Sequence, residues 1–426
     1  MCPLPSPRTR SVQREKRIAT SVGENETTSS EFYELAIRYV LVPSCRGSNA
    51  RHLPSQSALV SRGLKSGGKP PALQMSVLYS SVLQQHHTGH RVRFRIAANS
   101  SARINRESQE NPRMRYLVTG GAGFIGSNIV DELVRRNHEV VVLDDLSAGN
   151  ESNLSAVRSK IDFRIGSVTD LAAVESAVKG ADYVLHLAAR TSVPRSVKDP
   201  LDTNHVNIDG TLNVLVAARD AKVRRFVYAA SSAAYGETPT LPKTESMQPE
   251  PISPYGVAKY VGELYAQAFG RSYGLENASV RYFNVFGPRQ DPTSQYSGVL
   301  SRFMLAVIQN QPPAIYGDGE QSRDFTYIDN IVDETLRACD AKDASGKVFN
   351  GGTGARITLN QVIKLLEKIT GKKIQPQYDP PRNGDIRDSQ ADISLARKIL
   401  GYQPVVEFEE GLRRTWAWYS RAYTKS

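Results

Sequence analysis

The chain has 426 residues, a net charge of +11 and only three cysteines. This length allows two or three domains, and so few cysteines argue against a disulfide framework or a cysteine-based zinc site. No uninterrupted apolar stretch reaches the length of a membrane span, and the N-terminus lacks the basic start and apolar core of a secretory signal, so we expect a cytoplasmic protein with no membrane partner.

The positive charge is concentrated in residues 1–113, which hold 17 Lys and Arg against 7 Glu and no Asp. Because the rest of the chain is close to neutral, the net charge does not argue for a nucleic-acid partner. The segment is rich in polar residues without a sustained apolar period, which predicts disorder. Met114 opens the first predicted strand directly. The extension is therefore either the product of an upstream start assignment or an organelle transit peptide, which its Arg and Ser content favours.

A cluster of three histidines lies within this extension, at His86, His87 and His90. Carboxylate and cysteine residues, which usually complete a metal site, do not accompany them. We interpret the cluster as a solvated polar tract and expect no metal.

From Met114 onward, short apolar strands alternate with amphipathic helices, which predicts a doubly wound parallel α/β sheet of the Rossmann type. The predicted strands span residues 116–119, 140–143, 162–165, 183–187, 226–230 and 278–282. After residue 284 the sequence becomes rich in Pro- and Gly-containing loops, with helices predicted at 298–310, 330–341 and 359–370. We therefore expect a dinucleotide-binding domain at 114–290 and a smaller α/β substrate-binding lobe at 291–426, interleaved with the sheet at 329–341 and 348–352.

A glycine-rich turn follows the first predicted strand. Gly120, Gly123 and Gly126 lie three residues apart between that strand and a helix, where the backbone turns tightly and approaches a pyrophosphate. The second strand ends in Asp144 and Asp145, about 20 residues further on, where a ribose diol requires a carboxylate. A carboxylate also repels a 2′-phosphate, so the predicted cofactor is NAD rather than NADP.

Two candidate catalytic residues lie four apart in S-P-Y-G-V-A-K-Y, so Tyr255 and Lys259 share one face of a helix. A nearby ammonium and a positive nicotinamide both favour the phenolate of a tyrosine. The strand at 226–230 delivers Ser231 and Ser232 at its carboxyl end, where open α/β sheets bind ligands. We expect Ser231 to orient the reacting oxygen and Ser232 to lie beside it.

Several motifs together resemble one family. They are T-G-G-A-G-F-I-G at residues 119–126, H-L-A-A at 186–189, S-S-x-x-Y-G at 231–236, Y-x-x-x-K at 255–259 and R-Y-F-N at 281–284. The combination resembles the extended short-chain dehydrogenases/reductases that act as nucleotide-sugar epimerases and dehydratases, over residues 114–419. Additional sequence motifs at 192–196, 241–245, 285–292 and 317–325 resemble those of UDP-N-acetylglucosamine 4-epimerases in particular.

The resemblance implies that Ser231, Tyr255 and Lys259 form a catalytic triad. The cofactor set comprises Gly120, Gly123, Phe124, Ile125, Gly126, Asp144, Asp145, Ser147, Gly149, Ser167, Val168, Leu187, Ala188, Ala189, Tyr255 and Lys259. The substrate set comprises Thr191, Ser192, Ser231 and Ser232 at the sugar, and Asn284, Val299, Tyr316, Arg323, Arg382 and Asp385 at UDP. A guanidinium suits a diphosphate, whereas Tyr316 could equally stack on uracil or pack in the core.

Two residues depart from the family pattern. Ser167 replaces a usual Asp, which puts the contact to the adenine amino group in doubt, although Val168 could still pack on the ring. Ala233 replaces a Ser or Thr that relatives of the N-acetyl type often carry. Ala233 and Ala234 also occupy positions where dehydratases and decarboxylases carry acidic groups.

The implied reaction is NAD-dependent epimerisation at C4 of a UDP-sugar through a 4-keto intermediate. UDP-N-acetylglucosamine and UDP-N-acetylgalactosamine are the expected pair, because the small Ser389 replaces a bulky Tyr of epimerases limited to UDP-glucose and UDP-galactose. The alternative role for Ser389 is capping a helix near Ile393. Other functions left open are a UDP-glucose or UDP-glucuronate 4-epimerase, a dehydratase or decarboxylase, and a non-catalytic nucleotide-binding scaffold.

A homodimer is also expected. Apolar residues on the helix after Asp202 and on the helix carrying Tyr255 could form a four-helix interface, as they do in the enzymes that the chain resembles. These residues are Leu212, Leu215, Val216, Val261, Leu264 and Ala268.

Overall fold

The computed structural model describes residues 112–292, 298–381 and 386–424. Nearly all of the predicted extension lies outside this range, including its three histidines, and so do Arg382 and Asp385. None of the described helices is long and apolar enough to cross a membrane.

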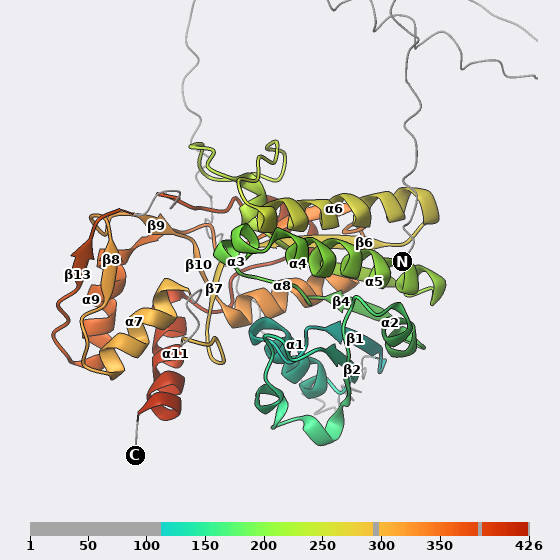
Figure 1. The fold of residues 1–426 in the computed structure, drawn as a ribbon, viewed down its shortest axis with the longest axis horizontal. Coiled ribbons are helices and arrows are strands. Elements are labelled where there is room, and N and C mark those ends of the chain that lie inside the picture. The colour runs from blue at the N-terminus through green and yellow to red at the C-terminus, as the bar shows by residue number, and fades with distance from the viewer. Residues whose placement is uncertain (1–111, 293–297, 382–385, 425–426) are drawn as a thin grey trace, which may run out of the picture. The chain divides into compact units, whose positions relative to one another are not determined.

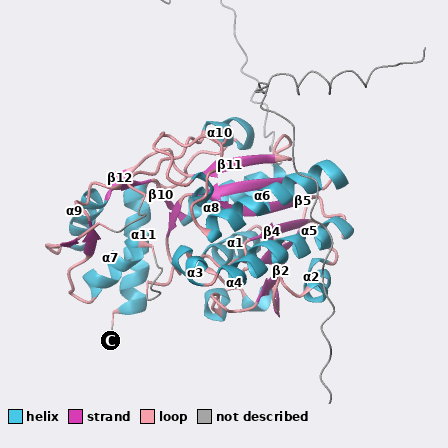
Figure 2. Cartoon of the chain, turned by 45° about the horizontal axis from the view of Figure 1, so that its top comes forward, coloured by secondary structure: helices cyan, strands magenta, loops and turns pink. Residues whose placement is uncertain are grey.

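Seven strands form one parallel sheet (Figure 2). They are β1 (Arg115–Thr119), β2 (Glu139–Asp144), β3 (Asp162–Ile165), β4 (Tyr183–His186), β5 (Arg225–Ser231), β6 (Asn277–Tyr282) and β11 (Lys347–Gly351). Their order is β11-β6-β5-β4-β1-β2-β3, and every neighbouring pair is parallel. The predicted doubly wound sheet is confirmed.

Helices cover both faces of the sheet (Figure 1). On one face, α1 (Phe124–Arg135) packs against α8 (Ile328–Asp340). On the other, α5 (Gly210–Asp220) lies between α2 (Leu171–Val178) and α6 (Pro254–Tyr273). The strands are apolar on both sides because each face has its own layer of helices.

The core is divided into two clusters by the alternation of side chains along the strands. Val118, Val142 and Leu185 belong to the cluster beneath α1 and α8. Their neighbours Leu117, Val141 and Val184 belong to the cluster beneath α2, α5 and α6. A two-sided core of this kind fixes the strand register, because a shift by one residue would exchange the two sets.

A buried ion pair joins α6 to β6. The Arg281 guanidinium donates to both carboxylate oxygens of Glu263, at 2.9 and 2.7 Å. Their side chains are only 3% and 1% exposed, so each charge depends on the other for compensation. The pair therefore anchors the helix that carries Tyr255 and Lys259.

The second lobe contains three pairs of short strands. These are β7 (Asn284–Phe286) with β10 (Phe325–Tyr327), β8 (Ala314–Tyr316) with β13 (Gln377–Asp379), and β9 (Ser322–Arg323) with β12 (Ile357–Thr358). Its helices are α7 (Val299–Ile308), α9 (Leu359–Thr370) and α11 (Phe408–Tyr423), whereas α10 (Ser394–Leu400) packs against β11 and α8 of the sheet domain. Two elements that follow residue 291 belong to the main sheet: β11 pairs with β6, and α8 packs against β5 and β6.

Candidate active site

The glycine turn between β1 and α1 is as tight as the sequence predicts. Gly120 has a φ of +71°, and a Cβ added there would lie 2.6 Å from the amide nitrogen of Ala188. A Cβ on Gly126 would lie 2.2 Å from the carbonyl oxygen of Gly120. Gly123 precedes α1, and no side chain caps this end of the helix. The backbone thus forms a close-fitting cradle at a helix N-terminus, which suits the diphosphate of a dinucleotide.

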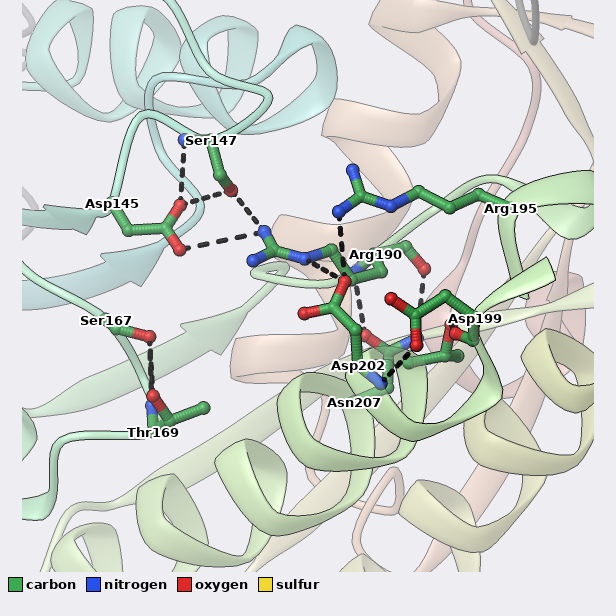
Figure 3. Close-up of polar contacts among 10 residues, drawn as sticks. Asp145, Ser147, Ser167, Thr169, Arg190, Arg195, Asp199, Asp202 and Asn207 are labelled. Atoms are coloured by element: carbon green, nitrogen blue, oxygen red, sulfur yellow. Dashed lines mark hydrogen bonds and ion pairs between the residues drawn. The ribbon is translucent and has the colours of Figure 1, made fainter.

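Asp144 and Asp145, at the end of β2, have different environments. Asp144 is 6% exposed and accepts hydrogen bonds from the amides of Ala122 and Leu146, both at 2.9 Å. Burial raises the pKa of Asp144, and these two bonds oppose the increase. Asp145 is more exposed and accepts from the Ser147 amide at 2.9 Å (Figure 3). A Cβ on Gly149 would collide with the Asp144 carboxylate at 2.8 Å, so the loop closes over this residue.

Other residues of the predicted cofactor-binding set follow β3 and β4. The Ser167 hydroxyl pairs with the Thr169 hydroxyl at 2.9 Å and accepts from the Thr169 amide at 3.2 Å (Figure 3). Val168 is 4% exposed and packs against Gly210, which limits its surface for an adenine ring. Residues 187–189 are half-buried and follow β4 beside the glycine turn.

The proposed catalytic residues meet where β5 ends. Ser231 is the last residue of β5, against which α6 packs, and its side chain lowers the pKa of the Tyr255 phenol. The Tyr255 amide donates to the Ser196 hydroxyl at 3.1 Å. The Lys259 ammonium donates to the carbonyl of Ala229 at 2.8 Å and lies 4.9 Å from the centre of the Tyr228 ring.

Burial opposes charge on both Tyr255 and Lys259. It raises the pKa of Tyr255, and the nearby Ser231 side chain partly offsets the increase. It lowers the pKa of Lys259 to about 8, against the attraction of Glu263. Lys259 was expected to favour the phenolate, but the residue of this chain that lowers the pKa of Tyr255 is Ser231.

His186 of the H-L-A-A motif is buried and hydrogen-bonded inside the fold. Its ring nitrogens lie 2.7 Å from the Thr119 hydroxyl and 2.9 Å from the Thr211 hydroxyl. Burial and, secondarily, Lys259 lower its pKa to about 3, so the ring is neutral at physiological pH. The histidine therefore links β4 to β1 and α5 rather than carrying charge.

Part of the predicted substrate set lies along β9. The Ser389 amide donates to the Ser322 carbonyl at 3.1 Å, and the Arg323 guanidinium donates to the Arg387 carbonyl at 2.8 Å. Ser389 does not cap α10, because the residue before that helix is Ile393 and the Ser394 amide bonds to Asp392. The alternative capping role is therefore wrong.

The remaining predicted substrate residues occupy varied positions. Asn284, Val299 and Tyr316 are half-buried at the starts of β7 and α7 and at the end of β8, so Tyr316 is not a fully buried core residue. Thr191 is exposed. The Ser192 hydroxyl caps α3 (Val193–Lys198) by accepting from the Arg195 amide at 3.1 Å, which gives it a structural role.

Comparison with known proteins identifies the family. The model of the NAD-dependent epimerase/dehydratase family matches residues 116–352, more than half of the chain. The chain belongs to this family. The resemblance found in the sequence is confirmed, and so, at the level of the family, is NAD as the cofactor.

Individual members of the family are similar over nearly their whole length. The UDP-glucose 4-epimerase of Mycolicibacterium smegmatis is 39% identical over 71% of this chain and 97% of its own. The crystal structure of Thermotoga maritima UDP-glucose 4-epimerase with UDP-glucose is 41% identical, with a TM-score of 0.69 over 72% of this chain and 99% of that chain. A UDP-N-acetylglucosamine 4-epimerase from Methanobrevibacter ruminantium, in complex with UDP-N-acetylmuramic acid, is 39% identical, with a TM-score of 0.70 over 73% and 99%.

Proposed function

We propose that the protein is an NAD-dependent UDP-sugar 4-epimerase that interconverts UDP-N-acetylglucosamine and UDP-N-acetylgalactosamine. The observation that carries the activity is the packing of α6, with Tyr255 and Lys259, against the end of β5, with Ser231, in the sheet that also holds the glycine cradle. Family membership and the epimerase relatives support the same assignment.

Each of the three catalytic residues has a separate task. Bound NAD supplies the hydride acceptor and donor for C4 of the sugar. Tyr255, as phenolate, accepts the proton of the sugar O4 and later returns it. Ser231 orients that oxygen, and Lys259 provides positive charge on the same helix face. A UDP group anchored in the second lobe leaves the sugar ring free to turn over.

The described site gives little support to dehydration or decarboxylation. Those reactions need an additional acid or base beside the strand-end serines. Ala233 and Ala234 follow Ser231 and Ser232 here, and Ala234 is fully buried. The chain therefore places no titratable side chain at those two positions.

The choice of sugar depends on Ser389. Its hydrogen bond to Ser322 places it beside Arg323, a proposed diphosphate contact. A hydroxymethyl group leaves room for a 2-acetamido group during ring turnover, whereas a tyrosine ring would occupy that space. The proposed diphosphate and ribose contacts Arg382 and Asp385 lie outside the described residues.

The decisive experiment incubates single UDP-sugars with the enzyme and separates the epimers. We expect the acetylated pair to interconvert faster than UDP-glucose and UDP-galactose. Ser389→Tyr should slow the acetylated sugars and spare UDP-galactose, while Ser394→Tyr, at an exposed position nearby, should change neither. Equal loss for both pairs would reject the role of Ser389, and inactivity on acetylated sugars would favour a UDP-glucose or UDP-glucuronate epimerase.

We also propose a homodimer, although Leu215, one of the residues expected at its interface, is buried in the core, and Leu212 and Val216 pack against that core. Around α6 and α4 (Pro200–Asn204), large apolar side chains face solvent in the single chain: Leu201 is 80%, Val197 65%, Ile252 58% and Leu264 45% exposed. Such a patch is typical of a surface that a partner covers.

A further inference from the structure

The end of β4 carries an arginine for which the sequence analysis found no role. The Arg190 guanidinium contacts three residues (Figure 3). Its side chain is only 17% exposed. Nη1 donates to the Ser147 hydroxyl and lies 3.7 Å from the Asp145 carboxylate. Nε donates to the Asp202 carboxylate at 3.0 Å. One cation thus joins the loop after β2 to α4.

The backbone of Arg190 is held equally firmly. Its amide donates to the Asn207 side-chain oxygen at 2.7 Å, and the Asn207 amide group donates back to the Arg190 carbonyl at 3.0 Å. Asn207 is 1% exposed, so the anchor is buried. Asp202 is fixed as well, since its own amide donates to the Asp199 carboxylate at 3.1 Å. Hydrogen bonds therefore hold the bridge in place on the side of α4.

The position of this bridge relative to the strands indicates its function. β1 lies between β2 and β4, so a contact from the end of β4 to the loop after β2 crosses the carboxyl end of β1 and its glycine turn. The chain leaves β1 toward one face of the sheet through α1 and leaves β4 toward the other through α5. The crevice at such a switch of direction is where open α/β sheets bind dinucleotides.

We propose that Arg190 is a positioning residue that retains the cofactor, by fastening the Asp145–Ser147 loop to α4 across the crevice. An epimerase of the proposed kind returns NAD to its starting state in each cycle, so slow release costs it no turnover. Asp145, which the sequence analysis placed at the ribose, has this loop contact as a second task. The inference rests on the proposed binding of NAD and adds the residue that governs its lifetime on the enzyme.

Arg195 provides a matched control. It also donates to the Asp202 carboxylate, at 3.1 Å, but the structure gives it no contact with Asp145 or Ser147. Arg195→Gln therefore removes an arginine from the same carboxylate and leaves the bridge to the β2 loop in place. Arg190→Lys keeps the positive charge, but its single ammonium group replaces the forked guanidinium that contacts Ser147 and Asp202 at the same time.

The test measures NAD on the full chain. Each variant is loaded with NAD, passed through a desalting column and diluted, and the NAD that remains bound is measured over time. Arg190→Gln should release NAD at least about 10-fold faster than the wild type, because hydrogen bonds to a charged group are lost. Arg190→Lys should lie between them, and Arg195→Gln should match the wild type.

A second measurement separates retention from other roles. With saturating NAD, the kcat of Arg190→Gln should return to that of the wild type. Unchanged release from Arg190→Gln, equally fast release from Arg195→Gln, a kcat that stays low at saturating NAD, or a wild type that holds no NAD would each overturn the proposal. A wild type that holds NAD tightly but converts no UDP-sugar would overturn the proposed function and leave the role of Arg190 intact.

Discussion

At the scale of single residues, Tyr255 and Ser231 form the smallest unit on which the proposed chemistry depends. Tyr255→Phe removes the phenolic oxygen and leaves the ring and the helix in place. We expect epimerisation to fall by about 10²- to 10⁴-fold, the usual effect of losing a general base. The measurement is kcat with a UDP-sugar, together with the NAD content of the variant, which should equal that of the wild type.

Two results would contradict this role for Tyr255. Turnover close to the wild-type rate would remove it as the base. Loss of bound NAD together with activity would show that the side chain mainly holds the cofactor.

The low pKa of Lys259 predicts how the stability of the protein changes with pH. Burial lowers its pKa to about 8 in the folded chain, from an ordinary value of 10.5. Between these values the unfolded chain binds more protons than the folded chain, so the free energy of unfolding rises with pH in this window. Relative to Lys259→Met, the wild type should gain about 2 kcal/mol of stability between about pH 7.5 and pH 10.

Urea unfolding of both proteins at the two pH values, without added NAD, measures this difference. The subtraction cancels the other groups that titrate in the same range. A stability difference that does not change with pH would mean that Lys259 keeps its ordinary pKa in the fold.

At the scale of elements, the glycine turn depends on contact between its own backbone atoms. A methyl group on Gly126 would lie 2.2 Å from the Gly120 carbonyl oxygen and 2.8 Å from the Gly121 Cα, so the turn must open to admit it. Gly126→Ala should destabilise the protein by about 1–3 kcal/mol and weaken NAD binding. Gly123→Ala, whose added carbon meets the Gly120 oxygen at 3.2 Å, should cost less.

Thermal unfolding of both variants with and without NAD tests this prediction. Gly126→Ala should show the lower Tm and the smaller increase on adding NAD. Equal behaviour of the two variants would mean that the turn adapts at both positions.

Elements with a buried apolar pattern were predictable from the sequence. The six predicted strands agree with β1 to β6 to within one residue at each end. All of them except the edge strand β3 are mostly buried, because helices cover both faces of the sheet there. The three short strand pairs of the second lobe were not predicted. Each strand has two or three residues, too few for a period, and their partners lie far away in the chain.

The same limit applies to the site. Ser231, Tyr255 and Lys259 could be proposed from the sequence because a strand end and an i,i+4 spacing are visible locally. Arg190 was missed because its partners Ser147 and Asp202 lie 43 and 12 residues away, in polar segments without a pattern. Only the order of the strands brings these segments together.

At the scale of the whole molecule, the apolar surface around α4 and α6 is where we propose that a second copy of the chain binds. Leu264 lies on the exposed side of α6, on the helix whose inner side carries Lys259 and Glu263. A two-fold axis would pair this surface with itself, as closed homodimers require. Dimerisation would also stiffen the helix that positions Tyr255.

Leu264→Asp should therefore convert a dimer into a monomer, because a carboxylate would be buried opposite its own copy. Val405→Asp is the control, since Val405 is 56% exposed and precedes α11, away from α6. Light scattering of the wild type should give twice the mass of the chain, with the control unchanged and Leu264→Asp at the mass of one chain. A wild type that is monomeric, or a Leu264→Asp protein that remains dimeric, would place the contact elsewhere or remove it. If the monomer also loses activity while keeping its fold, then the stiffness of α6 comes from the interface, and Tyr255 depends on the partner for its position.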